Sequence, residues 1–115
     1  MNGALHIRGH LLPDDEVVDL WIADGVLQHE PVPDADTIAT DAWIIPGLVD
    51  AHCHIGLSAE GAVSPETIRA QALADLAAGT MLIRDAGSPS DTRWVQSDDA
   101  LPRLVRAGRH VARPK

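Results

Sequence analysis

The chain has 115 residues, with 17 acidic side chains, nine basic ones and a formal net charge of −8. This length corresponds to about one domain, and 45% apolar residues with 23% charged residues are typical of a globular chain. The acidic balance argues against nucleic-acid and anionic-membrane partners, which need clustered Lys and Arg. The single cysteine excludes an internal disulfide, and no apolar run approaches the ~20 residues of a membrane span. We therefore expect a cytoplasmic protein.

Residues 1–45 have the pattern of short strands separated by turns. Apolar and polar side chains alternate over Leu5–Arg8, and Val17–Ile22 is a β-branched run. The Ala-Asp-Gly sequence at residues 23–25 predicts a hairpin turn into a return strand, and the strand pattern resumes over Thr37–Ile45. No helical period interrupts this stretch, so the sequence predicts a small all-β segment.

At residue 46 the pattern changes to that of an α/β fold. Leu48–Ile55 is a mostly apolar run bounded by glycines, which predicts a strand buried on both faces. Ser64 followed by Pro65 is a typical start for a helix, because serine caps the first turn and proline is favoured at the first helical position. Gly79 supplies the stop.

The remaining segments continue the alternation. Thr80–Arg84 is predicted as a second buried strand and is followed by a loop over residues 85–90. A short helix is expected over Pro102–Ala107, and His110–Ala112 is expected to begin a third strand. Residues 46–115 therefore predict a β-α-β-α-β order with a parallel sheet. Such a sheet has an open edge and an uncovered face, which suggests part of a larger fold.

The most specific chemical feature is the pair His52 and His54. Side chains alternate along a strand, so both imidazoles are expected on one face with Cys53 on the other, where it would be an inert core thiol. Two imidazoles at the end of a buried parallel strand can chelate a divalent ion. The plainer interpretation is that a His-x-His sequence occurs often by chance and binds nothing.

Two aspartates are weaker candidates. Asp50 is expected on the face of His52, where its carboxylate would either orient an imidazole or accept a hydrogen bond from a backbone amide. Asp85 ends the second predicted strand, where it would line a pocket; a salt bridge or a loop cap is the simpler role and the one we favour. His110 is expected to be structural.

The run from Ile45 to His54, Ile-Pro-Gly-Leu-Val-Asp-Ala-His-Cys-His, resembles the first barrel strand of the amidohydrolase superfamily, in particular its imidazolonepropionase- and prolidase-like metal-dependent hydrolases. Thr37–Trp43 resembles the strand that those enzymes run into the barrel, and residues 77–87 resemble their second barrel strand and its loop. The resemblance implies a partial (β/α)8 TIM barrel, its first three strands, in residues 46–115. Residues 1–45 would then be the N-terminal part of a composite β-sandwich.

The same resemblance implies a function. His52 and His54 match the pair that binds the more buried metal, so the implied cofactor is a divalent metal, zinc first, with one or two ions. The implied reaction is hydrolysis of a non-peptide or small dipeptide-like C–N bond in a small amide or cyclic amide by a metal-activated water. The other ligands would come from later strands, because Lys115 is the only lysine and lies too early for the fourth strand.

Other interpretations stay open. The chain alone would be inactive, and it would serve as a truncated barrel fragment that binds metal weakly or associates through its open sheet edge. A homo-oligomer is one such outcome. The same scaffold also hosts deaminases, ring-opening hydrolases, isomerases and decarboxylases, and fold alone does not choose among them.

Overall fold

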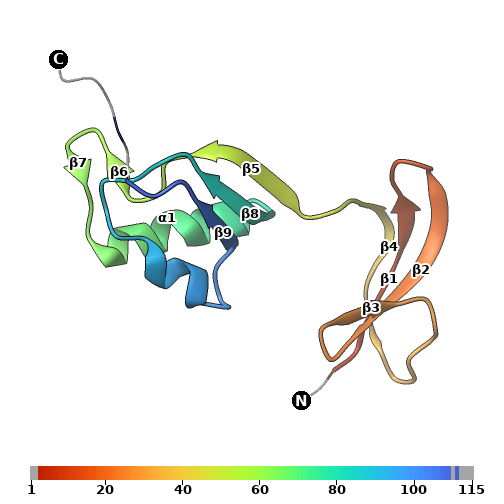
Figure 1. Cartoon of the computed structure of the whole chain (residues 1–115). Helices are drawn as coiled ribbons and strands as arrows, with labels where there is room; N and C mark the ends of the chain where they lie inside the picture. The colour runs from red at the N-terminus through yellow and green to blue at the C-terminus, as the bar shows by residue number, and fades with distance from the viewer. Residues whose placement is uncertain (1–2, 110, 112–115) are drawn as a thin grey trace. The chain divides into compact units, whose positions relative to one another are not determined.

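The computed structural model describes residues 3–109 and residue 111. The chain divides into two compact units, with the division between Pro46 and Gly47 (Figure 1). Within the described residues, no helix is long and apolar enough to cross a membrane. His110, Lys115 and most of the predicted third strand, His110–Ala112, lie outside the described residues.

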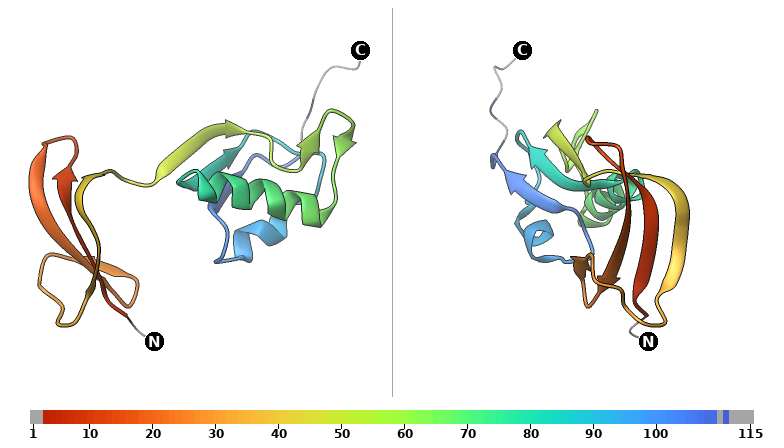
Figure 2. Two further views of the ribbon diagram at one scale, coloured as in Figure 1. Left: turned by 180° about the vertical axis from the view of Figure 1, so that it is seen from behind. Right: turned by 90° about the vertical axis from the view of Figure 1, so that its right-hand side faces the viewer.

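The first unit is a mixed sheet of four strands. Its strands lie side by side in the order β3-β2-β1-β4, and β1 pairs antiparallel with β2 and parallel with β4 (Figure 2). The strands span β1 (Leu5–Leu11), β2 (Glu16–Ala23), β3 (Val26–Gln28) and β4 (Asp36–Ile44). The predicted strands of this segment are thereby confirmed.

The predicted hairpin turn joins β2 to β3. Asp24 and Gly25 both have positive φ, 50° and 74°, and the flanking residues Ala23 and Val26 pair across the two strands. Positive φ at both central positions suits a two-residue turn whose twist matches that of the strands it connects. Glycine adopts this conformation without steric cost, and aspartate is among the other residues that tolerate it.

The second unit is built on a parallel three-stranded sheet, in the order β5-β8-β9, with α1 packed on one face (Figure 2). A two-stranded hairpin and a short 3-10 helix, η1, complete it. The bounds are β5 (Leu48–Cys53), β6 (Leu57–Ser58), β7 (Gly61–Ala62), α1 (Pro65–Ala77), β8 (Thr80–Asp85), η1 (Arg93–Ser97) and β9 (Arg103–Arg106). The chain is thus α/β, with many strands and one α-helix in its described part.

Helix α1 begins and ends as the sequence predicts. The Ser64 side chain accepts a hydrogen bond from the Thr67 backbone amide at 3.3 Å, and Pro65 is the first helical residue. Ile68 and Ala72 of α1 are buried, whereas Arg69 is exposed and pairs with Asp98. The serine cap satisfies one of the amides that the first turn leaves without an intrahelical partner.

The segment after β8 differs from the prediction. Residues 103–106 form strand β9 instead of the helix expected over Pro102–Ala107, and η1 provides the crossover from β8. The reason is packing. Leu104 is buried in the core while its neighbours Arg103 and Val105 are exposed, so the segment alternates with the period of a strand. In a run of six residues with arginine at two positions, that period is not visible in the hydrophobicity pattern.

The core of the second unit lies between the sheet and its two helices. It contains Ile55, Ile68, Ala72, Ile83, Val95, Leu101 and Leu104. On the other face of the sheet, Val49 of β5 and Val105 of β9 are 57% and 53% exposed. The expectation that Leu48–Ile55 forms a strand buried on both faces is therefore wrong for this chain, because α1 and η1 cover only one face of the sheet.

Candidate metal centre

The structure brings the imidazoles of His52 and His54 together. Strand β5 ends at Cys53, so His52 is its penultimate residue and His54 is the first residue beyond it. The two ring centroids are 5.1 Å apart and the ring planes are inclined at 76°. His52 is exposed and His54 is half-buried. Both rings therefore lie at the C-terminal end of a parallel strand, which is where α/β folds place ligands.

A hydrogen bond fixes the orientation of the His54 ring. Its Nδ1 lies 2.8 Å from the backbone carbonyl oxygen of Gly87. A carbonyl oxygen can only accept, so Nδ1 carries the proton and donates it, and a neutral ring then has its lone pair on Nε2. Metal-binding histidines typically make this kind of bond through their second ring nitrogen. The donor chemistry of His54 thus fits a divalent metal.

Asp85 holds the loop that contacts His54. Its side chain is 1% exposed, and its Oδ1 accepts a hydrogen bond of 3.0 Å from the Gly87 backbone amide. The adjacent Ala86 amide donates to the carbonyl of Cys53 at 2.8 Å. The structure therefore gives Asp85 the geometry of a loop cap. Its Oδ2 is buried and has no hydrogen-bond partner among the described residues.

Three residues shape the turn that follows His54. Gly56 has a positive φ of 84°, and its amide donates to Gln71 Oε1 of α1 at 2.8 Å. Gln71 Nε2 donates to the carbonyl of Leu57 at 3.2 Å, and Ser90 Oγ donates to the carbonyl of Gly56 at 2.7 Å. Neither Gln71 nor Ser90 is predicted from the sequence. The available signal was the position of Gln71 three residues after Ile68, on the buried side of α1.

Asp50 lies on a different face from the one expected. Its Oδ1 accepts a hydrogen bond of 3.1 Å from the backbone amide of His52, which is the second of the two roles considered. Its carboxylate also lies within 4.8 Å of the Cys53 sulfur and of a carboxylate oxygen of Asp75 on α1. The pairing of β5 with β8 is irregular between Asp50 and Cys53. An extra residue on one strand shifts the alternation of side chains, so Asp50 and Cys53 fall on the same side.

Two members of this group, Cys53 and Asp75, have raised pKa values. Burial, followed by the charges of Asp50 and Asp75, raises the pKa of the Cys53 thiol to about 11. Burial, followed by the charge of Asp50, also raises the pKa of Asp75. A metal ligand must be the thiolate, so a neutral Cys53 is a poor donor. The sulfur instead packs against the hydrophobic core, as the sequence predicts.

The histidines of the first unit take part in other contacts. His6 Nε2 lies 2.8 Å from Asp19 Oδ1, and His10 Nδ1 lies 2.8 Å from Asp15 Oδ1. The His6 ring also stacks on Trp21, with ring centroids 4.8 Å apart. His6 and His10 thus take part in contacts within the first unit.

Comparison with known proteins gives relatives of greater length. No family model matches the chain. A protein of Mycobacterium bovis and one of Mycobacterium tuberculosis, both named only as uncharacterized, are each 52% identical to it over 111 residues. That match covers 96% of this chain and 30% of each relative. The chain therefore spans less than a third of the length of the curated relatives that it matches.

Solved structures of larger proteins also match this chain over about a third of their own length. A candidate prolidase from Bifidobacterium longum has a TM-score of 0.70 and 20% identity, covering 100% of this chain and 32% of its own. A Xaa-Pro dipeptidase with bound methionine has a TM-score of 0.61 and 19% identity, covering 96% of this chain and 34% of its own. At this identity the likeness shows the fold. The chain thus has an α/β fold that is shared with about a third of each of these larger proteins.

Proposed function

We propose that this chain is the N-terminal part of a metal-dependent hydrolase in which His52 and His54 bind a divalent metal ion. Zinc is the ion that we favour. The observation that carries the proposal is the pair of imidazoles 5.1 Å apart at the end of a parallel strand. The bond from His54 to Gly87 adds to it, because it leaves the His54 lone pair on Nε2. The prolidase-like fold of the solved neighbours supports the same conclusion.

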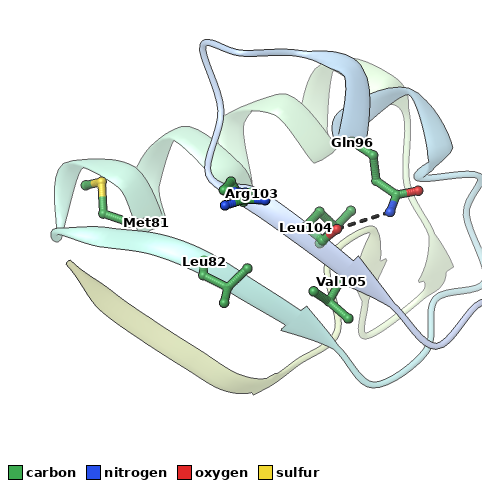
Figure 3. Close-up of a pocket in the computed structure, with 6 residues that line it drawn as sticks. All are labelled: Met81, Leu82, Gln96, Arg103, Leu104 and Val105. Carbon is green, nitrogen blue, oxygen red and sulfur yellow. Dashed lines mark hydrogen bonds between the residues drawn. The ribbon is translucent and has the colours of Figure 1, made fainter. Parts of the chain in front are cut away.

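The uncovered parts of the second unit support a larger barrel, of which β5, β8 and β9 would be the first three strands. A hollow of about 630 Å³ lies along β9 and is lined in part by Leu82, Leu104 and Val105 (Figure 3). Strand β9 ends the sheet on one side and β5 ends it on the other. Further strands would pair with these two edges and bury the exposed valines, as closure of a barrel requires.

The roles of the residues in hand follow from their contacts. At such a site a divalent ion supplies activation of water for attack on a polarised carbonyl. Gly87 orients the His54 ring, and Asp85 fixes Gly87 through its amide. His52 lies at the exposed end of the strand, where it would complete a two-imidazole chelate with His54. The other ligands would come from outside this chain.

For the substrate we favour a small dipeptide-like amide over a cyclic amide. The solved neighbours with known names are a candidate prolidase and a Xaa-Pro dipeptidase, both named for action on short peptides. Fold alone does not fix the bond that is cleaved. Assays on a panel of dipeptides and cyclic amides are needed to choose between the two substrate classes.

The test replaces His52 and His54, one at a time, in the complete protein. His52→Ala and His54→Ala should each lose most of the bound metal, measured by elemental analysis, and most of the turnover on a panel of dipeptides and cyclic amides. His29→Ala is the matched control, because His29 is exposed in the first unit. Full metal content and turnover in both His52→Ala and His54→Ala would overturn the proposal.

A further inference from the structure

A second polar site lies beyond the C-terminal ends of β8 and β9, and neither His52 nor His54 lines it. It is a pocket of about 230 Å³ between the loop of residues 88–91 and the segment that follows β9. Three arginines line it, namely Arg93, Arg106 and Arg109. The chain has nine basic residues and a net charge of −8, so a third of its positive side chains gather at one small pocket.

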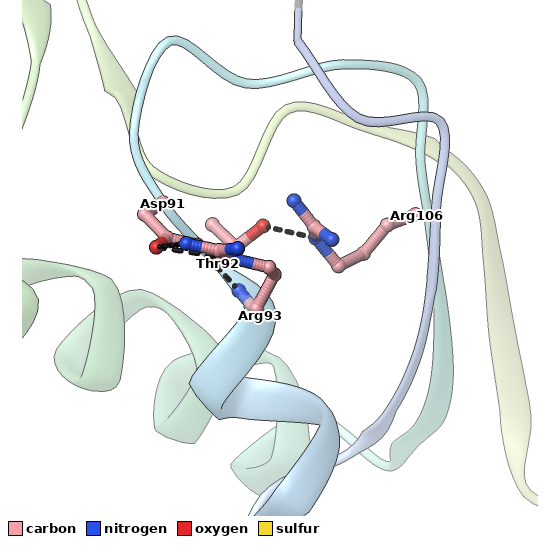
Figure 4. Close-up of polar contacts among 4 residues, drawn as sticks. All are labelled: Asp91, Thr92, Arg93 and Arg106. Carbon is pink, nitrogen blue, oxygen red and sulfur yellow. Dashed lines mark hydrogen bonds and ion pairs between the residues drawn. The ribbon is translucent and has the colours of Figure 1, made fainter.

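One of these charges is compensated within the pocket. Arg93 Nε and Nη2 donate to the two carboxylate oxygens of Asp91, at 2.9 Å and 2.6 Å (Figure 4). These hydrogen bonds hold the pKa of Asp91 well below its usual range, so the carboxylate stays ionised and paired. Neither Arg106 nor Arg109 has a carboxylate partner among residues 3–109 and 111. The pocket lining therefore holds three arginines against the one carboxylate of Asp91, whose pKa the charge of Arg106 also lowers.

The Arg106 guanidinium is held in place before any ligand binds. Its Nε donates a hydrogen bond of 2.9 Å to Oγ1 of Thr92, a residue that is fully buried (Figure 4). With Nε engaged, the two terminal nitrogens supply the remaining donors of the fork. A hydrogen bond also joins the two segments that line the pocket, because the Ser88 amide donates to the Gly108 carbonyl at 3.0 Å. A preorganised guanidinium loses little freedom when it binds an anion.

We propose that this pocket binds an oxyanion, the carboxylate or phosphate group of a small molecule, through Arg106 and Arg109. The planar donor fork of arginine matches both groups, and two arginines with no carboxylate partner supply the charge. The site makes use of neither imidazole of the histidine pair. It therefore goes beyond the proposed hydrolase function and does not depend on a bound metal.

The test titrates the complete protein with inorganic phosphate and, separately, with N-acetylglycine. The readout is the shift of arginine Nε–H signals in NMR spectra of arginine-labelled protein. We expect saturable binding that weakens as the salt concentration rises. Arg106→Gln and Arg109→Gln should each weaken it at least about tenfold, the usual size of a lost charged hydrogen bond. Tighter binding of phosphate or of N-acetylglycine identifies which of the two groups the ligand carries.

Arg103→Gln is the matched control, because Arg103 lies on the same strand but does not line the pocket. Arg109 is exposed, so Arg109→Gln decides the matter even if loss of the Thr92 bond unfolds the Arg106 variant. Absence of saturable binding for both anions, or unchanged affinity in Arg109→Gln, would overturn the proposal. Loss of binding when a chelator removes metal would overturn it too, since the anion would then be a metal ligand. Unchanged binding after chelation supports it.

Discussion

The two units of the chain bury apolar surface to very different extents. In the second unit, a helix and a 3-10 helix cover one face of the sheet, and seven hydrophobic residues form one buried cluster. In the first unit, Leu20 is the buried hydrophobic residue of the described part. Exposed apolar residues lie on β2, β3 and β4 instead, among them Val17, Leu27, Ile38 and Trp43. Burial of apolar area is the main favourable term in folding, so the units should differ in local stability.

The two units also differ in what holds their residues in place, which is backbone hydrogen bonding in the first unit and side-chain packing in the second. The first unit has a regular ladder between β1 and β2 from Leu5 to Leu11, yet its described residues form a single sheet. The second unit has shorter strands and an irregular pairing of β5 with β8, but its residues are fixed by a core. We therefore expect amide exchange to be slowest in β8 and in the buried side of α1, and faster in β1–β4.

The largest expected effect is loss of a core side chain. Ile83 is fully buried at the centre of the second unit, so Ile83→Ala should lower the free energy of unfolding by about 2–5 kcal/mol. Ile38→Ala removes the same atoms from β4, where the side chain is 56% exposed, and should cost less than about 1 kcal/mol. Denaturant unfolding of the complete protein measures both. Equal losses would mean that the first unit has a core of comparable strength.

A pair of glycines tests the same contrast at the backbone. Both Gly25 and Gly56 have positive φ, so alanine is strained at each by about 1 kcal/mol or more. At Gly25 a new Cβ meets nothing within 4 Å. At Gly56 it would lie 2.7 Å from Ser88 Oγ and 3.0 Å from Ser90 Cβ, which adds the cost of overpacking.

Gly56→Ala should therefore cost about 2–3 kcal/mol, against about 1 kcal/mol for Gly25→Ala. Thermal unfolding of the two variants, compared at the same temperature, separates strain from crowding. A cost at Gly56 no greater than that at Gly25 would show that the turn after His54 is loosely packed. The positioning of His54 by this turn would then be in doubt.

Much of the fold was predictable where local chemistry decides it. The cap of Ser64 on α1 and the Asp24-Gly25 turn rest on interactions within a few residues, and both predictions are confirmed. Strand β9 was missed, because the burial of Leu104 against η1 is a tertiary effect that a six-residue pattern does not reveal. Asp50 was placed on the wrong face, because a register shift between neighbouring strands leaves no mark in the sequence.

Part of the candidate site is also predictable from the sequence, and part of it depends on the fold. The proximity of His52 and His54 agrees with their spacing of two residues at the end of β5, so the sequence predicts it. Their metal-binding role stays a prediction, since it depends on ligands outside the chain. Gln71, Ser90 and Asp75 come to the site from α1 and from the loop after β8, and only the fold brings them there.

A matched pair of glutamines gives a smaller effect. Gln71→Ala removes the acceptor of the amide of Gly56, a buried residue, and the donor to the Leu57 carbonyl, and it should cost about 1–2 kcal/mol. Gln28 in the first unit donates at its exposed surface to the Glu30 carbonyl, and Gln28→Ala should cost less than about 0.5 kcal/mol. If the proposed metal centre is right, Gln71→Ala also weakens metal binding while Gln28→Ala does not. Similar losses of stability would place the Gly56 amide in contact with water.

The smallest effect concerns the start of α1. Ser64→Ala removes the side chain that accepts from the Thr67 amide and should cost about 1 kcal/mol, as loss of a helix cap usually does. Ser97→Ala, at the exposed end of η1, is the control. Ser64 caps a helix of the second unit, and the described part of the first unit consists of strands. Hydrogen exchange in Ser64→Ala should therefore quicken at the amides of the first turn of α1 and stay unchanged in β1–β4. Faster exchange in both units would mean that they unfold together, and the contrast in burial would then not be one in local stability.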